Sequence, residues 1–161
     1  LLEVSREVQA EGWTFNKESH YPMTPDTNNE ILIPNNVLQI DPTHNGSNVG
    51  LDVVRRSGKL YDKAHHSYSF TNEIECDITW LFDWVDIPTP IADFIVNRAA
   101  SIVSSRIVGD SNQYQMLQQK EAFARAMAME YECNQGDYTF FGHPGNTNTY
   151  NSYKPYNALY R

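Results

Sequence analysis

Residues 74–84 read Ile-Glu-Cys-Asp-Ile-Thr-Trp-Leu-Phe-Asp-Trp, and every even-numbered position in this stretch is apolar. The odd-numbered positions are acidic or polar, with Leu81 the exception. Successive side chains of a strand point to opposite faces of a sheet, so this alternation predicts one long β-strand with a buried face. On this prediction the indole rings of Trp80 and Trp84 lie on the buried face and Asp83 lies on the other.

The apolar period changes from two to 3.6 after this strand. Thr89 suits the N-cap of a helix and Pro90 suits its first position. Apolar residues then recur at helical spacing until Gly109, which predicts an amphipathic helix. Its expected buried stripe consists of Ile91, Phe94, Ile95, Ala99, Ile102, Val103 and Ile107.

A second long helix is predicted over residues 110–133. Asp110 and Gln113 have the spacing of a capping box at its start. Because Gly109 alone separates the two helices, we expect an antiparallel pair. The second face of this helix carries three further large apolar residues, which are candidates for a contact between subunits: Met116, Phe123 and Met127.

The chain before the long strand begins with a helical pattern and then becomes rich in turns. Leu1, Val4 and Val8 predict a helix within residues 1–12, and a short β-type run follows at 13–17. Four of the eight prolines and six asparagines lie in residues 19–50, so turns should dominate there. Short strands are expected at four places: 31–33, 37–40, 51–55 and 59–62, the last two as a hairpin.

These predictions give an α+β fold with three parts. Residues 1–12 and 89–135 form a helical bundle, which comprises the N-terminal helix and the long antiparallel pair. Residues 13–88 form a β-rich module inserted into that bundle. Residues 136–161 have no sustained period and predict an extended C-terminal arm, whose aromatic anchors would dock on a neighbouring chain. The anchors are Tyr150, Tyr153, Tyr156 and Tyr160.

The charge balance excludes some partners. The 161 residues include 12 Lys and Arg against 20 Asp and Glu, a net charge of −8, whereas a phosphate-binding surface would need a basic face. No apolar run approaches the roughly 20 residues that span a bilayer, so we expect no membrane association. Between Lys63 and Arg98 there is no Lys or Arg. The acidic residues there predict either a solvated face or a surface that faces passing nucleic acid: Glu73, Glu75, Asp77, Asp83, Asp86 and Asp93.

The sequence contains no motif that identifies an enzyme, a metal site or a cofactor site. His65 and His66 are adjacent, so in a regular strand they point to opposite faces and cannot bind one ion together. Cys76 and Cys133 do not have the spacing of metal ligands. Two alternatives remain open: a carbohydrate-active tail hydrolase, in which the carboxylates near Trp80 and Trp84 would cleave sugars, and a monomeric binding module.

Two stretches resemble a known family. The first is REVQAEGWTFN at residues 6–16, and the second is residues 117–138, which end in MEYECNQGDY. Tyr61-Asp62, the alternating strand and the helix that starts at Pro90 occur between them in the expected order. Over residues 5–141 the chain resembles tail tubular protein A, the head-to-tail adaptor, or gatekeeper, of short-tailed bacteriophages.

The resemblance implies a structural protein of the virion tail, assembled in the cytoplasm of the bacterial host. Members form dodecameric rings between the portal protein and the tail nozzle protein, which is tail tubular protein B. Double-stranded DNA passes through the lumen of the ring without specific binding. The family fold is a helical bundle with a β-rich module, and its N-terminal helical region would precede Leu1.

Overall fold

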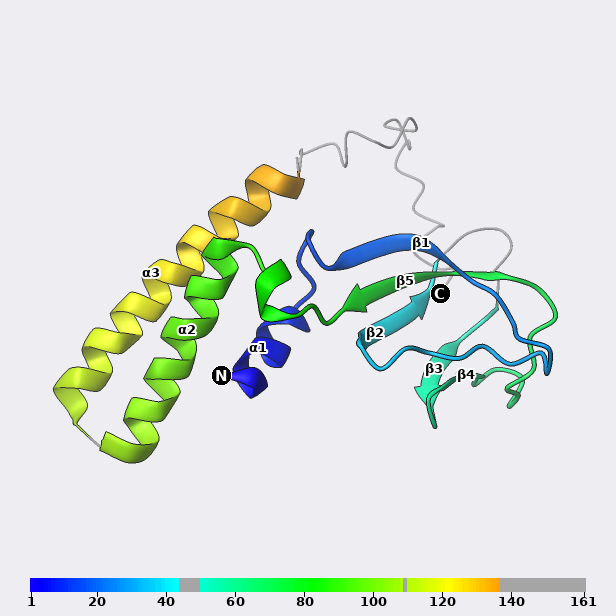
Figure 1. The fold of residues 1–161 in the computed structure, drawn as a ribbon, viewed down its shortest axis with the longest axis horizontal. Coiled ribbons are helices and arrows are strands. Elements are labelled where there is room, and N and C mark those ends of the chain that lie inside the picture. Colours follow the sequence, from blue (N-terminus) through cyan, green and yellow to red (C-terminus); the bar gives the residue numbers. More distant parts are fainter. Residues whose placement is uncertain (44–49, 109, 137–161) are drawn as a thin grey trace, which may run out of the picture.

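The structure is a computed structural model that describes residues 1–43, 50–108 and 110–136. These residues form helices and two small antiparallel sheets, in agreement with the predicted α+β class (Figure 1). In chain order the elements are α1 (Leu2–Gln9), β1 (Lys17–Met23), β2 (Val37–Pro42), β3 (Val53–Arg56), β4 (Lys59–Asp62), β5 (Ile74–Trp80), a 3₁₀ turn (Trp84–Asp86), α2 (Thr89–Val103), a π-helical turn (Ser104–Val108) and α3 (Ser111–Gly136).

Strand β5 is the centre of a three-stranded sheet with the order β1-β5-β2, and both of its neighbours are antiparallel to it. The predicted alternation is confirmed at Ile74, Cys76 and Ile78, which are all buried. The strand ends at Trp80, earlier than predicted. Beyond it the backbone N–H and C=O of Phe82 both bond to the side-chain amide of Gln9 in α1.

The placement of Trp84 on the buried face was wrong. Because Gln9 draws the chain away from the sheet at Phe82, the period of two is lost before Trp84 is reached. Trp84 lies instead in the 3₁₀ turn, where 44% of its surface is exposed. The helix α2 begins three residues after this turn.

The upstream strands differ in part from the prediction. Residues 13–16 form a turn, closed by a bond from the Trp13 amide to the Asn16 side chain (2.8 Å), and the strand β1 follows it. Residues 31–33 form only an isolated bridge, in which Leu32 pairs with Lys59. The β2 strand and the β3–β4 hairpin are confirmed. Ser57 and Gly58 both have positive φ (53° and 74°), as a type I′ hairpin turn requires.

The two long helices pack side by side, and α3 runs back along α2 (Figure 1). Pro88, rather than Thr89, occupies the cap position of α2. The buried stripe of α2 reaches only Ile102, because Val103 lies about 100° further around the helix and Ile107 lies in the wider π turn. Both side chains are exposed. At the start of α3 the Asp110 carboxylate accepts a bond from the Asn112 amide (2.9 Å).

The described residues contain two hydrophobic cores. One lies among the strands and the loop at residues 31–33, and it includes Leu60 and Ile78. The other joins α1, α2 and α3 around Phe94 and Ala128. A buried polar junction connects the two parts: Glu132 of α3 accepts bonds from the backbone amide and hydroxyl of Thr14.

Candidate subunit interface

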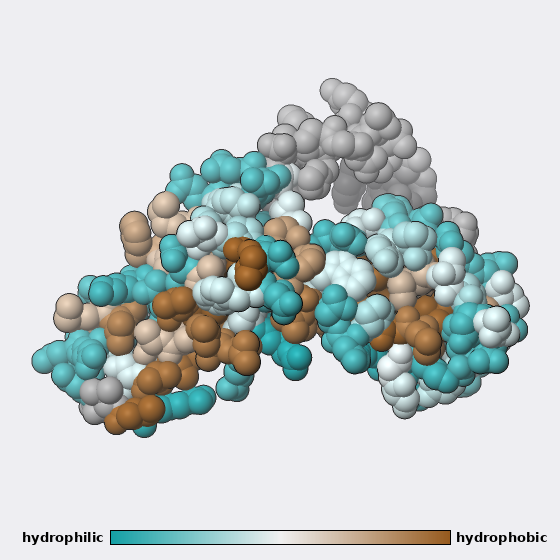
Figure 2. All heavy atoms as spheres, in the orientation of Figure 1, coloured by the Kyte–Doolittle hydropathy of each residue, from teal (hydrophilic) through white to brown (hydrophobic). Residues whose placement is uncertain are grey.

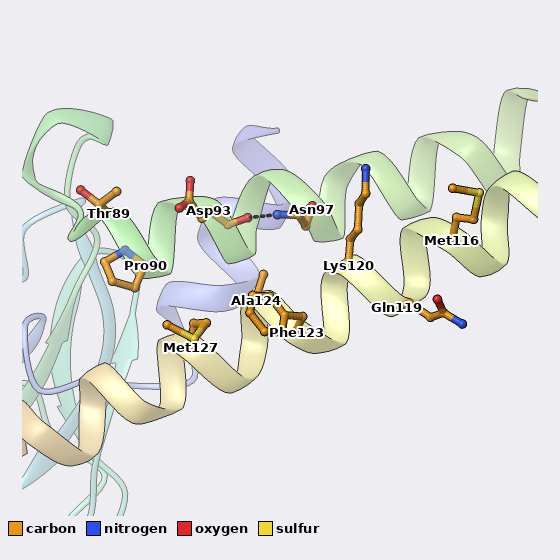
Figure 3. Close-up of a pocket in the computed structure, with 10 residues that line it drawn as sticks. All are labelled: Thr89, Pro90, Asp93, Asn97, Met116, Gln119, Lys120, Phe123, Ala124 and Met127. Carbon is orange, nitrogen blue, oxygen red and sulfur yellow. Dashed lines mark hydrogen bonds between the residues drawn. The ribbon is translucent and has the colours of Figure 1, made fainter.

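A groove of about 640 Å³ runs between α2 and α3. Met116, Phe123 and Met127 line it from α3, and each of these side chains is exposed, Phe123 to 69%. Figure 2 shows hydrophobic side chains gathered over the α2–α3 part of the molecule. Figure 3 shows the groove itself, whose remaining lining residues are Thr89, Pro90, Asp93, Asn97, Gln119, Lys120 and Ala124.

A neighbouring face of α3, about 100° around the helix, packs against α2 through small side chains. Ala124 and Ala128 are buried, and Ala128 has no exposed surface. Small residues let the two helix backbones approach closely, so the larger side chains at positions 116, 123 and 127 are left on the outer side. An outward row on a helix is normally polar. A row of methionine and phenylalanine there is typical of a surface that meets another molecule.

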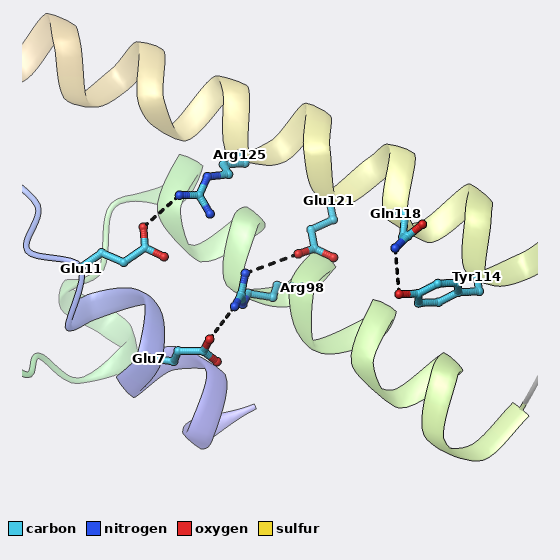
Figure 4. Close-up of polar contacts among 7 residues, drawn as sticks. All are labelled: Glu7, Glu11, Arg98, Tyr114, Gln118, Glu121 and Arg125. Atoms are coloured by element: carbon cyan, nitrogen blue, oxygen red, sulfur yellow. Dashed lines mark hydrogen bonds and ion pairs between the residues drawn. The ribbon is translucent and has the colours of Figure 1, made fainter.

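Helix α1 covers the other side of the α2–α3 pair and leaves the groove open. Figure 3 shows α1 behind the two helices, and Figure 4 shows it in front of them. On this covered side Arg98 of α2 bonds to Glu7 of α1 and lies 3.6 Å from Glu121 of α3. These contacts add ion pairs to the apolar packing that joins the three helices.

Polar groups line both walls of the groove. On α2, the side-chain amide of Asn97 donates to the backbone carbonyl of Asp93 (2.8 Å; Figure 3). On α3, Lys120 makes no ion pair with any residue that the structure describes. The helical spacing of the sequence places Met116, Phe123 and Met127 together, and it puts Lys120 on the same face of α3, although the sequence analysis did not single it out. The spacing gave no sign of the α2 wall, which joins the groove only through the packing of the two helices.

The acidic residues fall into two groups. Glu75 and Asp77 lie half-buried on β5, where Glu75 contacts the imidazole of His20 (2.9 Å) and Asp77 accepts a bond from Thr43 (2.9 Å). Glu73 is exposed just before this strand. Asp83 and Asp86 are exposed at the two ends of the segment 83–86, around Trp84 and Val85. The four tyrosines of the predicted arm, Tyr150, Tyr153, Tyr156 and Tyr160, lie outside the described residues.

The imidazole of His65 and the thiol of Cys76 are held in structural roles, and Cys133 is exposed. His65 bonds to the buried carboxylate of Asp62. Burial, followed by the charges of Asp77 and Asp41, raises the pKa of the Cys76 thiol to about 11, so the thiol is protonated at neutral pH.

Among residues 1–43, 50–108 and 110–136, no three His, Cys, Asp or Glu side chains form a group suited to a metal ion. No helix in the same ranges has the length and apolar character needed to cross a membrane.

Comparison with known proteins identifies the family. A search among curated proteins gave no match. The family model described as "Tail tubular protein" matches residues 1–138, which is most of the chain. This range contains all of the described helices and strands, including both walls of the groove. The chain therefore belongs to the tail tubular protein family, whose members are structural proteins of phage tails.

Proposed function

We propose that this protein is a head-to-tail adaptor of the tail tubular protein A type. Twelve copies form a ring that joins the portal protein to the nozzle protein, tail tubular protein B, and encloses the DNA exit channel. The observation that carries the proposal is the open apolar groove, which contains Met116, Phe123 and Met127, on a member of a phage tail family. In the ring, this groove is a contact between subunits.

The net charge of the chain supports an apolar contact. Twelve copies at −8 each carry −96, and like charges oppose the closure of a ring. Full burial of one large apolar side chain contributes about 1.5–3 kcal/mol, so three such side chains per interface offset a substantial repulsion. Duplex DNA carries about one negative charge per 1.7 Å of its axis. An acidic ring repels it weakly and lets it pass without specific binding.

The two cores suggest that the helical domain and the β-rich module have different roles in the ring. The helical domain, residues 1–12 and 89–135, carries the contacts that close the ring. The β-rich module, residues 13–88, is an excursion between the first and second helices and presents Glu73, Glu75 and Asp77. The arm, residues 136–161, docks its tyrosines on a neighbouring chain at the head-to-tail junction of the virion.

Light scattering tests the proposal. The mass of the full chain is measured alone and after mixing with the cognate portal protein. We expect a twelvefold particle, either free or formed on the portal. A chain that stays monomeric in both samples would contradict the proposal.

Two variants separate the groove from the arm. Phe123→Asp places a charge in the groove and should prevent assembly, whereas deletion of residues 142–161 removes the four tyrosines. A normal ring with Phe123→Asp would remove the groove from the interface. A normal ring after the deletion would remove the arm.

A further inference from the structure

A second exposed apolar surface lies where the chain enters α2. Trp84 and Val85 project from the 3₁₀ turn, and 91% of the Val85 surface is exposed. A hollow of about 490 Å³ lies beside them, between α1 and residues 81–84, and Leu2 and Arg6 line it. We refer to Leu2, Arg6 and the segment 83–86 as the corner.

The corner and the groove are on different sides of the helical part. The hollow of the corner is built on α1, and α1 lies on the face of the α2–α3 pair opposite the groove (Figures 3 and 4). A ring built from one repeated head-to-tail contact needs two different surfaces on each subunit. The corner, built on α1 and the segment 83–86, and the groove, built on α2 and α3, are two such surfaces.

The charges of the two surfaces are complementary. The corner presents the carboxylates of Asp83 and Asp86, neither of which has an ion-pair partner within the described ranges, and the groove presents Lys120. Glu3 and Arg6 also line the hollow of the corner, and Asp93 also lines the groove. The corner is therefore net acidic, and Lys120 is the basic residue of the groove that can face it.

We propose that the groove of one copy receives the corner of the next copy, with Trp84 and Val85 against Met116, Phe123 and Met127, and with Asp83 and Asp86 facing Lys120. This inference rests on the proposed ring, and it names the surface that fills the groove. Repeated around a closed circle, one such contact uses both surfaces of every subunit.

Charge reversal tests the pairing. One variant, Lys120→Glu, reverses the groove, and a second variant, Asp83→Lys with Asp86→Lys, reverses the corner. Each variant alone sets like charges against each other at every contact. In an equimolar mixture, a ring of alternating copies restores opposite charges at every contact. Lys63→Glu is the matched control, because Lys63 is exposed and follows β4, and neither strand of the β3–β4 sheet contributes a residue to the groove or the corner (Figure 1).

We expect each reversed variant to remain monomeric by light scattering under conditions in which the wild type assembles, and the mixture to regain at least half of the wild-type ring. Circular dichroism checks that each variant is folded. If both variants assemble alone, or if the mixture stays monomeric, the proposed pairing is wrong, whereas the proposed ring is not contradicted. If the wild type itself never assembles, with or without the portal protein, both the ring and the pairing are overturned.

Discussion

The sheet part and the helical part of the molecule differ in how completely they bury their apolar side chains. Among the described residues from 13 to 83, Tyr21 and Leu32 are the exposed large apolar side chains. The helices and the turn before α2 expose many more: Leu1, Leu2, Trp84, Val85, Val96, Val103, Ile107, Met116, Phe123, Met127 and Met129.

On the proposed function, this difference indicates which part of the chain meets other subunits. The sheets close their own core around Leu60 and Ile78, neither of which has exposed surface. The helices use one face for the core around Phe94 and leave the outer face apolar. Contacts between subunits are therefore expected from the helical part, and substitutions should separate residues that hold the fold from residues that hold the assembly.

The largest loss of stability is expected from Phe94→Ala. Phe94 has no exposed surface and lies at the centre of the helical core, so its truncation leaves a cavity between α1, α2 and α3. We expect the free energy of unfolding to fall by about 3–5 kcal/mol, measured by urea denaturation at one fixed protein concentration. Val96→Ala, on the exposed side of the same helix, is the control and should change it by about 0.5 kcal/mol or less. A loss below about 1 kcal/mol for Phe94→Ala would contradict the description of this core.

A smaller loss is expected from Glu132→Ala at the junction of the two parts. The Glu132 carboxylate accepts bonds from the Thr14 amide at 2.9 and 3.0 Å and from the Thr14 hydroxyl at 2.5 Å. Hydrogen bonds to a charged group contribute about 1.5–3 kcal/mol, and the substitution leaves the Thr14 amide without this acceptor. Urea denaturation should show this loss. Glu130→Ala, which is exposed two residues away, should leave the curve unchanged.

In the sheet part, Asp62 is expected to make stability depend on pH at acidic values. Burial of Asp62 raises its pKa, but hydrogen bonds from His65 and from the backbone amides of Ala64 and His65 outweigh burial and hold the pKa below the ordinary value of 3.8. The stabilisation from the ionised carboxylate is therefore complete above pH 3.8 and is lost as the pH falls through the lower pKa of the folded state.

Asp62→Asn removes this titration. The difference in unfolding midpoint between wild type and variant should be constant above about pH 5 and should shrink as the pH falls to about 2. A difference that grows on acidification would show that the carboxylate is not stabilised in its charged form. Asp52→Asn, at an exposed ion pair with Lys63, is the control.

The sequence predicted the parts of the fold that have a regular apolar period. The alternation in residues 74–78 and the stripe of α2 up to Ile102 both match the structure. Strand β1 was missed because six of its seven residues are exposed, and it includes Pro22, which an edge strand tolerates. The position of Trp84 was wrong because Gln9, a residue 73 positions from Phe82, ends the regular strand. A local period cannot show such a contact.

The candidate interface was predictable only in part for the same reason. Met116, Phe123 and Met127 share one helix face, so their spacing alone brings them together. Lys120 shares this face by its spacing from Met116 and Phe123, whereas Thr89 and Pro90 join it through the packing of α2 on α3. Trp84 and Val85 became candidates only when the structure showed the turn in which they lie.

The most direct test of the central claim compares two methionines of α3. Met127 lines the groove and Met129 lies outside it, yet their exposed fractions are almost equal, 45% and 46%. Met127→Asp and Met129→Asp should each change the stability of the monomer by about 0.5 kcal/mol or less, because both side chains are on the surface. Light scattering with the portal protein present should then show that Met127→Asp prevents the ring and that Met129→Asp does not. Equal assembly of the two variants would contradict the assignment of the groove as the subunit interface.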